Sequence, residues 1–369
     1  MNRRFLLVCL MLVLPLPLRA QQAVQNRLEL VHADTLRYER AGGAEIVHFI
    51  GNVFFRRGKK ELRCDHAIYY RDREVTVFKG HVVFVDSSRS LQADYVEYYS
   101  EPELERARGR VHLTVDKKEI FADELEYQVD REWARGKGNV LFEDPDNGVQ
   151  LRCDEFTYDR AAERGESERN PVLVKLDSLR HTEMTIRSRK MSYDGKKKIA
   201  VALDSVVITR GDIRALADTA RYVDPENRID ITGRPRVRQQ NTDMRARKIV
   251  LFLENDRLKQ ARLVGKAAIV SHFLVNGLPA ADRLYGAEIW MDVENDTLRH
   301  MKILGQATSV YHVIDENVVQ GLNQVMGDEM ELFFESGKVK RVSILSEPGL
   351  SKGKYFPRKF TDKKPAESF

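Results

Sequence analysis

Residues 62–84 read LRCDHAIYYRDREVTVFKGHVVF, and this stretch decides the fold because the chain repeats it. The next copies are LQADYVEYYSEPELERARGRVHL at residues 91–113 and IFADELEYQVDREWARGKGNVLF at residues 120–142. In each copy a small residue and Asp precede an apolar residue and Tyr, and a Gly-x-Val box follows. Recurrence at a fixed spacing indicates one supersecondary unit stacked on itself. The sequence therefore predicts a repeat protein with about ten repeats of roughly 30 residues.

Two columns of residues mark the period. The Asp column contains Asp34, Asp65, Asp94, Asp123, Asp154 and Asp218, and the Gly column, 15 to 17 residues further on, contains Gly51, Gly80, Gly109, Gly138 and Gly233. An active site needs one constellation of residues, so a side chain that recurs in most repeats is predicted to be structural. We expect each Asp to bond free backbone N–H groups at a corner and each Gly to supply backbone freedom there.

Within one repeat the apolar residues alternate at the period of a β-strand. The phase slips once, because Leu91 and Ala93 share one parity whereas Val96 and Tyr98 share the other. Such a slip is typical of a bulge or corner. Turn-forming residues separate the strands at both ends of each repeat, for example Asp194-Gly195-Lys196, which indicates hairpins. The predicted fold class is all-β, an elongated antiparallel β-jelly-roll.

Spacing and composition divide the chain into four parts. The predicted parts are a signal peptide at 1–20, regular β-repeats at 28–245, wider β-repeats at 246–346 with insertions at 271–285 and 311–325, and a basic tail without regular structure at 347–369. The signal has a basic start, a short apolar run and a cleavage site near Ala20. In the second insertion, the sequence DENVVQGLNQV could form a short helix.

Charge and cysteine usage exclude several classes of function. Once Arg3, Arg4 and Arg19 leave with the signal, 58 basic side chains face 56 acidic ones, so no basic face predicts nucleic-acid binding. The histidines show no metal-ligand spacing, and no phosphate-binding loop or nucleophile motif occurs. We therefore predict no enzyme, no metal and no cofactor. Cys64 and Cys153 stand where other repeats have small residues, and they are predicted to be unpaired.

The recurring boxes resemble those of the OstA-like family, the organic-solvent-tolerance or lipopolysaccharide-transport periplasmic bridge proteins. The Gly-Asn-Val box is intact at Gly51-Asn52-Val53 and at Gly138-Asn139-Val140, and the resemblance extends over most of 28–346. It implies a β-jelly-roll whose apolar interior holds the acyl chains of lipid A and whose ends pair edge to edge with other OstA-like domains. The chain has about twice the repeats of a short bridge protein, and it lacks the outer-membrane barrel that some relatives carry.

An apolar stripe follows the Gly column and is the candidate lipid-binding surface. Its residues are Val53, Phe55, Val82, Phe84, Val111, Leu113, Val140, Phe142, Val172, Val174, Val206 and Ile208. By sequence alone the stripe is better explained as a closed core. The family resemblance shifts the interpretation toward a trough, because a trough that holds acyl chains needs the same inward-facing apolar side chains. Small residues in the neighbouring column would leave room for a ligand or would allow tight packing.

The leading hypothesis is a non-enzymatic periplasmic protein that binds lipopolysaccharide and passes it toward the outer membrane, associated with partners at the inner or outer membrane. The alternative is a structural rod of the cell envelope with a closed core. A secreted polysaccharide-degrading enzyme is less favoured, because no carboxylate cluster interrupts the repeats. The terminal strands Leu28–Tyr38 and Lys338–Leu345 are candidate edges for pairing with another β domain.

Overall fold

The computed structural model describes residues 28–357, apart from Ser88 and the short stretches 255–256, 316–317, 336–337 and 348–350. The predicted signal peptide and the tail from residue 358 lie outside the described residues. The contacts divide the chain into two compact units, with unit 1 ending at Asp116 and unit 2 beginning at Lys117.

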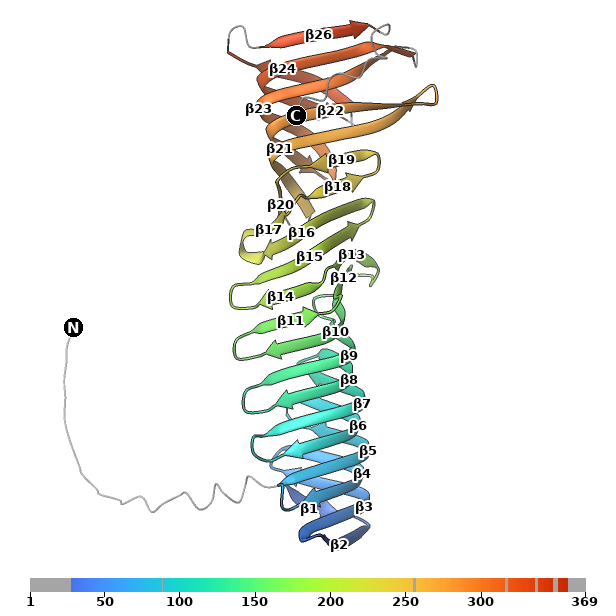
Figure 1. Ribbon diagram of the computed structural model, residues 1–369, viewed down its shortest axis with the longest axis vertical. Helices are drawn as coiled ribbons and strands as arrows, with labels where there is room; N and C mark the ends of the chain where they lie inside the picture. The colour runs from blue at the N-terminus through green and yellow to red at the C-terminus, as the bar shows by residue number, and fades with distance from the viewer. Residues whose placement is uncertain are drawn as a thin grey trace, which may run out of the picture. The chain divides into compact units, whose positions relative to one another are not determined.

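Unit 1 is an antiparallel meander in which each long strand pairs with the next (Figure 1). Its strands are β1 (Glu29–His32), β2 (Thr35–Ala41), β3 (Ala44–Arg57), β4 (Lys60–Tyr70), β5 (Val75–Val85), β6 (Arg89–Tyr99) and β7 (Leu104–Val115). The predicted edge Leu28–Tyr38 forms two short strands, because the chain turns a corner at Asp34. Both β1 and β2 pair with β3, each along one half of it.

Unit 2 continues the same pattern with longer strands toward the C-terminus. Its strands are β8 (Lys118–Gln128), β9 (Trp133–Asp144), β10 (Val149–Asp159), β11 (Arg164–Glu168), β12 (Val172–Leu176), β13 (Thr182–Arg187), β14 (Lys190–Asp194), β15 (Ile199–Arg210), β16 (Ile213–Val223), β17 (Arg228–Thr232), β18 (Arg236–Gln239), β19 (Thr242–Arg245), β20 (Lys248–Glu254), β21 (Arg257–Val275), β22 (Leu278–Glu294), β23 (Thr297–Asp315), β24 (Val318–Glu335), β25 (Lys338–Leu345) and β26 (Lys352–Pro357). The described residues include one helical turn, η1 (Asp224–Glu226). No helix in this part of the chain is long and apolar enough to cross a membrane.

The predicted antiparallel all-β fold is confirmed.

The long strands bend at the predicted corners, where two residues of one strand oppose one residue of its neighbour. Between β3 and β4 the paired residues are Ile50 with His66 and then Val53 with Cys64, so Gly51-Asn52 bulges opposite Asp65. Both bulge residues have positive φ, 79° at Gly51 and 48° at Asn52. Glycine and asparagine tolerate this left-handed conformation best, which explains the Gly-Asn box.

The Asp column braces these corners mainly through side chains. Asn139 Nδ2 donates to Asp123 Oδ2 at 2.8 Å, and Asn52 Nδ2 donates to Asp34 Oδ2 at 2.9 Å. The residue after the glycine contacts the Asp of its repeat at three further corners: His81 with Asp65, Arg110 with Asp94 and Arg234 with Asp218. We predicted that backbone N–H groups donate to these carboxylates. At these five corners the contact comes instead from the side chain after the glycine, because the bulge turns that side chain toward the carboxylate.

At two places in unit 2 the bent strand is replaced by a pair of short strands. Strand β10 pairs with β12 along its first half and with β11 along its second, and β13 and β14 then pair with the two halves of β15. Figure 1 shows the β12–β13 hairpin turned away from β11 and β14. Strands β17 to β20 repeat the arrangement between β16 and β21.

The predicted stripe is wrong by one residue in β12. Leu151 lies opposite both Phe142 and Leu173. Leu173 packs against the interior cluster that contains Val206. Because successive residues of a strand face opposite sides, Val172 and Val174 belong to the outer face. The sequence pattern misled because Arg169-Asn170 stands in the bulge without a glycine, which shifted our alignment of this repeat.

The two predicted insertions are extensions of strands. Residues 271–285 form the far end of the hairpin β21–β22, whose strands reach 19 and 17 residues. Residues 318–325, where a helix was expected, lie in β24 and pair with β23. The helix prediction is wrong because β23 continues past its corner and pairs with most residues of this segment. This is a long-range effect that the local pattern does not contain.

The prediction of a tail without regular structure from residue 347 is wrong for residues 352–357. These residues form β26, which pairs with Gly321–Met326 of β24. Tyr355 lies across Gly321, where a Cβ atom would come within 2.8 Å of the Tyr355 ring, and its hydroxyl donates to Gln320 O at 2.9 Å. The missing side chain at Gly321 makes room for the aromatic ring.

Candidate functional site

The structure buries most of the predicted stripe. Val53, Phe55, Val82, Phe84, Val111, Leu113, Val140 and Val206 are buried, whereas Phe142 and Ile208 are half-buried. Phe142 and Ile208 share a row with Leu151, Leu173 and Ile186, which are also half-buried. We call these five residues the half-buried row. Equivalent positions in unit 1, such as Phe55 and Phe84, are closed.

The interior of unit 1 is filled by aromatic side chains. The rings of Phe49, Phe55, Phe78, Phe84 and Tyr98 follow one another with centroids 5.2 to 6.3 Å apart. The cavity beside Leu62 and Phe84 has a volume of about 10 Å³, which leaves room for no more than about one water molecule. The ring contacts and the burial of Phe55, Phe78 and Phe84 indicate a packed interior in the described part of unit 1.

Charged side chains close unit 1 beside this core. Arg57 Nη1 and Lys60 Nζ, near the turn between β3 and β4, donate to Glu103 Oε1 at 3.0 and 2.9 Å. Arg57 also donates to the Tyr98 hydroxyl at 2.8 Å. Glu103 precedes β7 and stands at the opposite end of the bent strands. The bent strands of unit 1 therefore bring their two ends together, as a jelly-roll does.

A second ion pair lies deeper in the same unit. Arg89 donates to Glu105 through both terminal nitrogens at 2.7 Å, and its Nε donates to Asp86 Oδ2 at 2.9 Å. The side chains of Arg89 and Glu105 are 8% and 2% exposed. We did not predict this pair. The signal was present, because Glu105 stands four residues before the corner glycine, where other repeats have Val47, Thr76 and Ala134.

Burial and charge act in opposite directions on Glu103. Desolvation raises its pKa, but the hydrogen bond from Lys60 and the charges of Lys60 and Arg57 outweigh desolvation, so the pKa lies below the usual value. A lowered folded-state pKa means that this carboxylate stabilises the fold above the usual carboxyl range. Its contribution is lost as the pH falls through the folded pKa.

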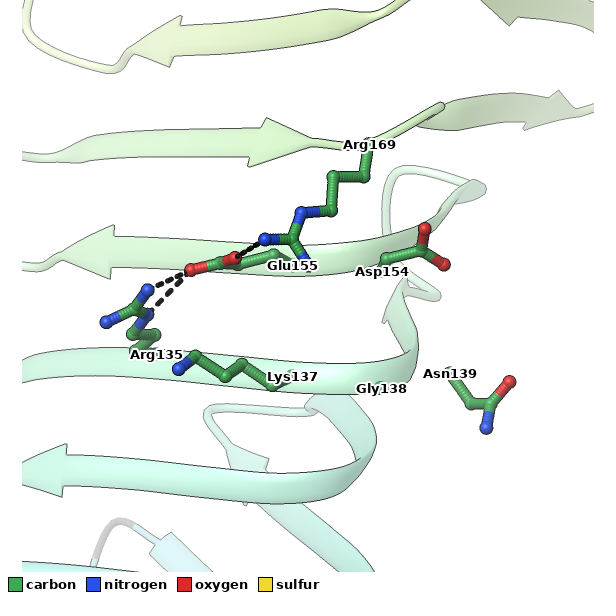
Figure 2. A pocket seen from close by; sticks show the side chains of 7 residues that line it. All are labelled: Arg135, Lys137, Gly138, Asn139, Asp154, Glu155 and Arg169. Atoms are coloured by element: carbon green, nitrogen blue, oxygen red, sulfur yellow. Dashed lines mark hydrogen bonds and ion pairs between the residues drawn. The ribbon is translucent and has the colours of Figure 1, made fainter.

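In unit 2 a polar pocket of about 410 Å³ lies beside the corner of β9 and β10 (Figure 2). Arg135 donates to Glu155 through Nε at 2.7 Å and through Nη2, and Arg169 Nη2 lies 3.8 Å from the same carboxylate. The bond from Arg135 holds the pKa of Glu155 below its usual value. Lys137 also lines the pocket, whereas Asp154 and Asn139 point away from Glu155. The two arginines therefore share the single carboxylate of Glu155.

The column of small residues is buried, as its role in packing requires. Cys64, Ala93, Ala122, Cys153 and Ser188 are all less than a tenth exposed. Among the described residues, no group of three or more His, Cys, Asp or Glu side chains could hold a metal ion.

Both thiols should react slowly in the native protein. Burial raises the pKa of Cys64 to about 12 and that of Cys153 to about 11, and the thiolate is the reactive form. A disulfide reagent at pH 8 should therefore label both cysteines quickly only after denaturation. In the chain without the predicted signal peptide, which contains Cys9, the variant Cys64→Ala should release one thiol on denaturation where the wild type releases two. Rapid native labelling would contradict the buried positions.

Comparisons with known proteins find similarity in part of the chain. Residues 25–135 match the family model described as OstA-like protein, which confirms the resemblance over these residues. No curated protein matches the sequence. Among solved structures the chain is similar to LptH of Pseudomonas aeruginosa, described as the LptA homologous periplasmic component of the conserved lipopolysaccharide transport device. The two are 18% identical over 37% of this chain and 95% of that one, with a TM-score of 0.27, too low to support a conclusion.

Proposed function

We propose that the protein is a non-enzymatic lipid-binding component of lipopolysaccharide transport, exported to the periplasm. The observation that carries this proposal is the half-buried row of unit 2. An apolar row closed to water would serve only as a core, whereas a half-buried row leaves apolar surface that an acyl chain can cover. The OstA-like region at 25–135 supports the same function, since the family resemblance implies lipid A as the ligand.

A structural envelope rod remains the second candidate, and the filled interior of unit 1 favours it. The aromatic series and the ion pairs at Glu103 and Glu105 leave no room for an acyl chain there. The two candidates therefore differ in unit 2, where only the lipid-binding function requires a ligand on the half-buried row.

A photocrosslinker at Phe142 or Leu173 should capture lipopolysaccharide in cells or from added lipid. The same crosslinker at Val172 should not, because Val172 faces the outer side of the same strand. Phe84 occupies the position of Phe142 in a closed repeat and should also stay unlabelled, as should the turn residue Asp146. Capture is read by mass spectrometry, with folding checked by circular dichroism. Equal capture at Leu173 and Val172, or none from folded protein, would favour the structural rod.

The proposed partners are other OstA-like domains that add a strand to an end of the sheet. At the N-terminal end β1 and β2 expose Leu30, Leu36 and Tyr38, and at the other end β25 exposes Val342 and Leu345. Within the described residues, β1 and β2 pair only with β3, and β25 pairs only with β24. Strands with one free edge are templates for another chain.

Replacing Leu30 or Val342 with proline should abolish end-to-end crosslinking, because proline has no N–H group to donate to a partner strand. Leu30→Ala and Val342→Ala keep the N–H and serve as controls. The measurement is site-directed crosslinking of purified protein, with the β signal in circular dichroism as a check on folding. Undiminished crosslinking in folded proline variants would rule out pairing through these edges.

A further inference from the structure

The far end of the β21–β22 hairpin stands apart from the rest of unit 2. The strand β19 accompanies β21 only as far as Ser271, and β23 accompanies β22 from Arg283 onward. Beyond these points the described strand residues 273–275 and 278–280 pair only with one another. Figure 1 shows the tip extending beyond β19. A two-stranded hairpin in water is marginally stable by itself, so this arm needs support from elsewhere.

The base of the arm is fixed to the neighbouring strand. The backbone N–H of His312 donates to Asp282 Oδ1 at 2.9 Å, and the His312 ring nitrogen Nδ1 lies 2.9 Å from the same oxygen. The Phe273 ring meets the His312 ring edge to face, with centroids 5.4 Å apart. These contacts orient the base of the arm, and none of them involves the residues at its tip.

The tip carries leucines where other turns carry charges. Leu274 and Leu278 are 69% and 71% exposed, and they flank a tight turn at Asn276-Gly277 with φ values of 52° and 77°. Residues 267–281 contain no Asp, Glu, Lys or Arg, in a chain in which 32% of residues are charged. Leu179, in the turn between β12 and β13, is 75% exposed but lies between Asp177 and Arg180. Of these two exposed tips, the one that lacks charged residues is therefore the tip of the β21–β22 hairpin.

We propose that the tip of the β21–β22 hairpin inserts Leu274 and Leu278 into the surface of a lipid bilayer. A stable protein interface needs about 800 Å² on each partner, more than a narrow tip with two leucines and a proline offers. A bilayer requires no such area, because each apolar side chain that enters the interface contributes separately. The absence of charge over fifteen residues removes the cost of bringing ionic groups into lipid.

The test is sedimentation of the mature chain with vesicles of phosphatidylethanolamine and a minority of phosphatidylglycerol. The wild-type protein should bind, and Leu274→Ser/Leu278→Ser should bind about tenfold or more weakly, since two apolar side chains are lost. Leu179→Ser is the matched control and should bind as the wild type does. Binding should persist in high salt, because burial of apolar surface is not screened.

A second measurement locates the tip directly. In Leu278→Trp the new indole should shift its emission to the blue and resist an aqueous quencher when vesicles are added, whereas Leu179→Trp should show neither change. Absence of vesicle binding by folded wild-type protein, equal binding by the double serine variant, or binding abolished by salt would each overturn the proposal. Loss of a dimer in light scattering, with vesicle binding unchanged in the double serine variant, would assign the tip to a second copy of the chain instead.

Discussion

Replacing Gly138 with alanine should lower the free energy of unfolding by about 3 kcal/mol. Gly138 has a φ of 72°, and a Cβ atom there would come within 2.4 Å of Asp123 Oδ2. The left-handed conformation costs an L-residue about 1–2 kcal/mol, and the overlap adds to that cost. Urea denaturation followed by circular dichroism should show the loss as an earlier transition in unit 2.

Two control variants separate the contributions. Gly211 also has a positive φ, 56°, but a Cβ atom there meets nothing within 4 Å. Gly211→Ala should therefore cost only about 1 kcal/mol. In the Gly138→Ala background, Asp123→Ala should restore part of the lost stability, because it removes the overlapping carboxylate. Without that recovery, contact between Asp123 and residue 138 would not be the cause of the destabilisation.

Removing the Glu105 carboxylate should lower the free energy of unfolding as much as Gly138→Ala does, for a different reason. Glu105→Ala removes the carboxylate that accepts hydrogen bonds from both terminal nitrogens of the buried Arg89. Breaking a buried pair by removing one partner typically costs about 3–5 kcal/mol. The expected measurement is a large fall in the midpoint of urea or thermal unfolding. Glu61→Ala is the control. Its partner Arg56 is half-exposed, so the loss should stay below about 1 kcal/mol.

A double variant identifies the source of that loss. Replacing Arg89 and Glu105 together with methionine removes both charges and keeps apolar volume, so it should cost less than Glu105→Ala alone. The difference measures the penalty of an uncompensated buried arginine. A double variant as unstable as the single one would mean that Arg89 and Glu105 contribute through packing and not through charge.

The sequence predicts those parts of the fold that every repeat specifies locally. The corners were visible because Asp123 and Gly138 recur with their equivalents, and the inward positions Val111 and Leu113 followed from alternation. The β12 register was missed because one bulge lacks glycine, and a shift of one residue exchanges the two faces of a strand. Strand β26 was missed because its position depends on Gly321, more than thirty residues earlier in the chain, and on the space that this glycine leaves.

The candidate site was predictable in composition but not in accessibility. The same apolar row is closed at Phe84 and half-buried at Phe142. Alternation assigns both residues to the interior, but it contains no information about what covers them. In unit 1 the cover includes Arg57, Lys60 and Glu103, whose contact joins opposite ends of the strands. Such contacts depend on the three-dimensional closure of the repeat, and no short stretch of sequence specifies them.

The replacement of bent strands by short pairs has a mechanical consequence. The bent strand β10 runs through its corner as one strand of eleven residues, whereas β11 and β12 are separate strands joined by residues 169–171. Pro171 contributes no N–H group to that junction. We expect this part of unit 2 to be more compliant than the parts with continuous bent strands. The pairs β11–β14 and β12–β13 should then separate under a smaller force, and the amides around Arg169 should exchange hydrogen first. If the short strands beside the half-buried row separate easily, a bulky amphiphile could enter between them while the pairing of the neighbouring strands stays intact.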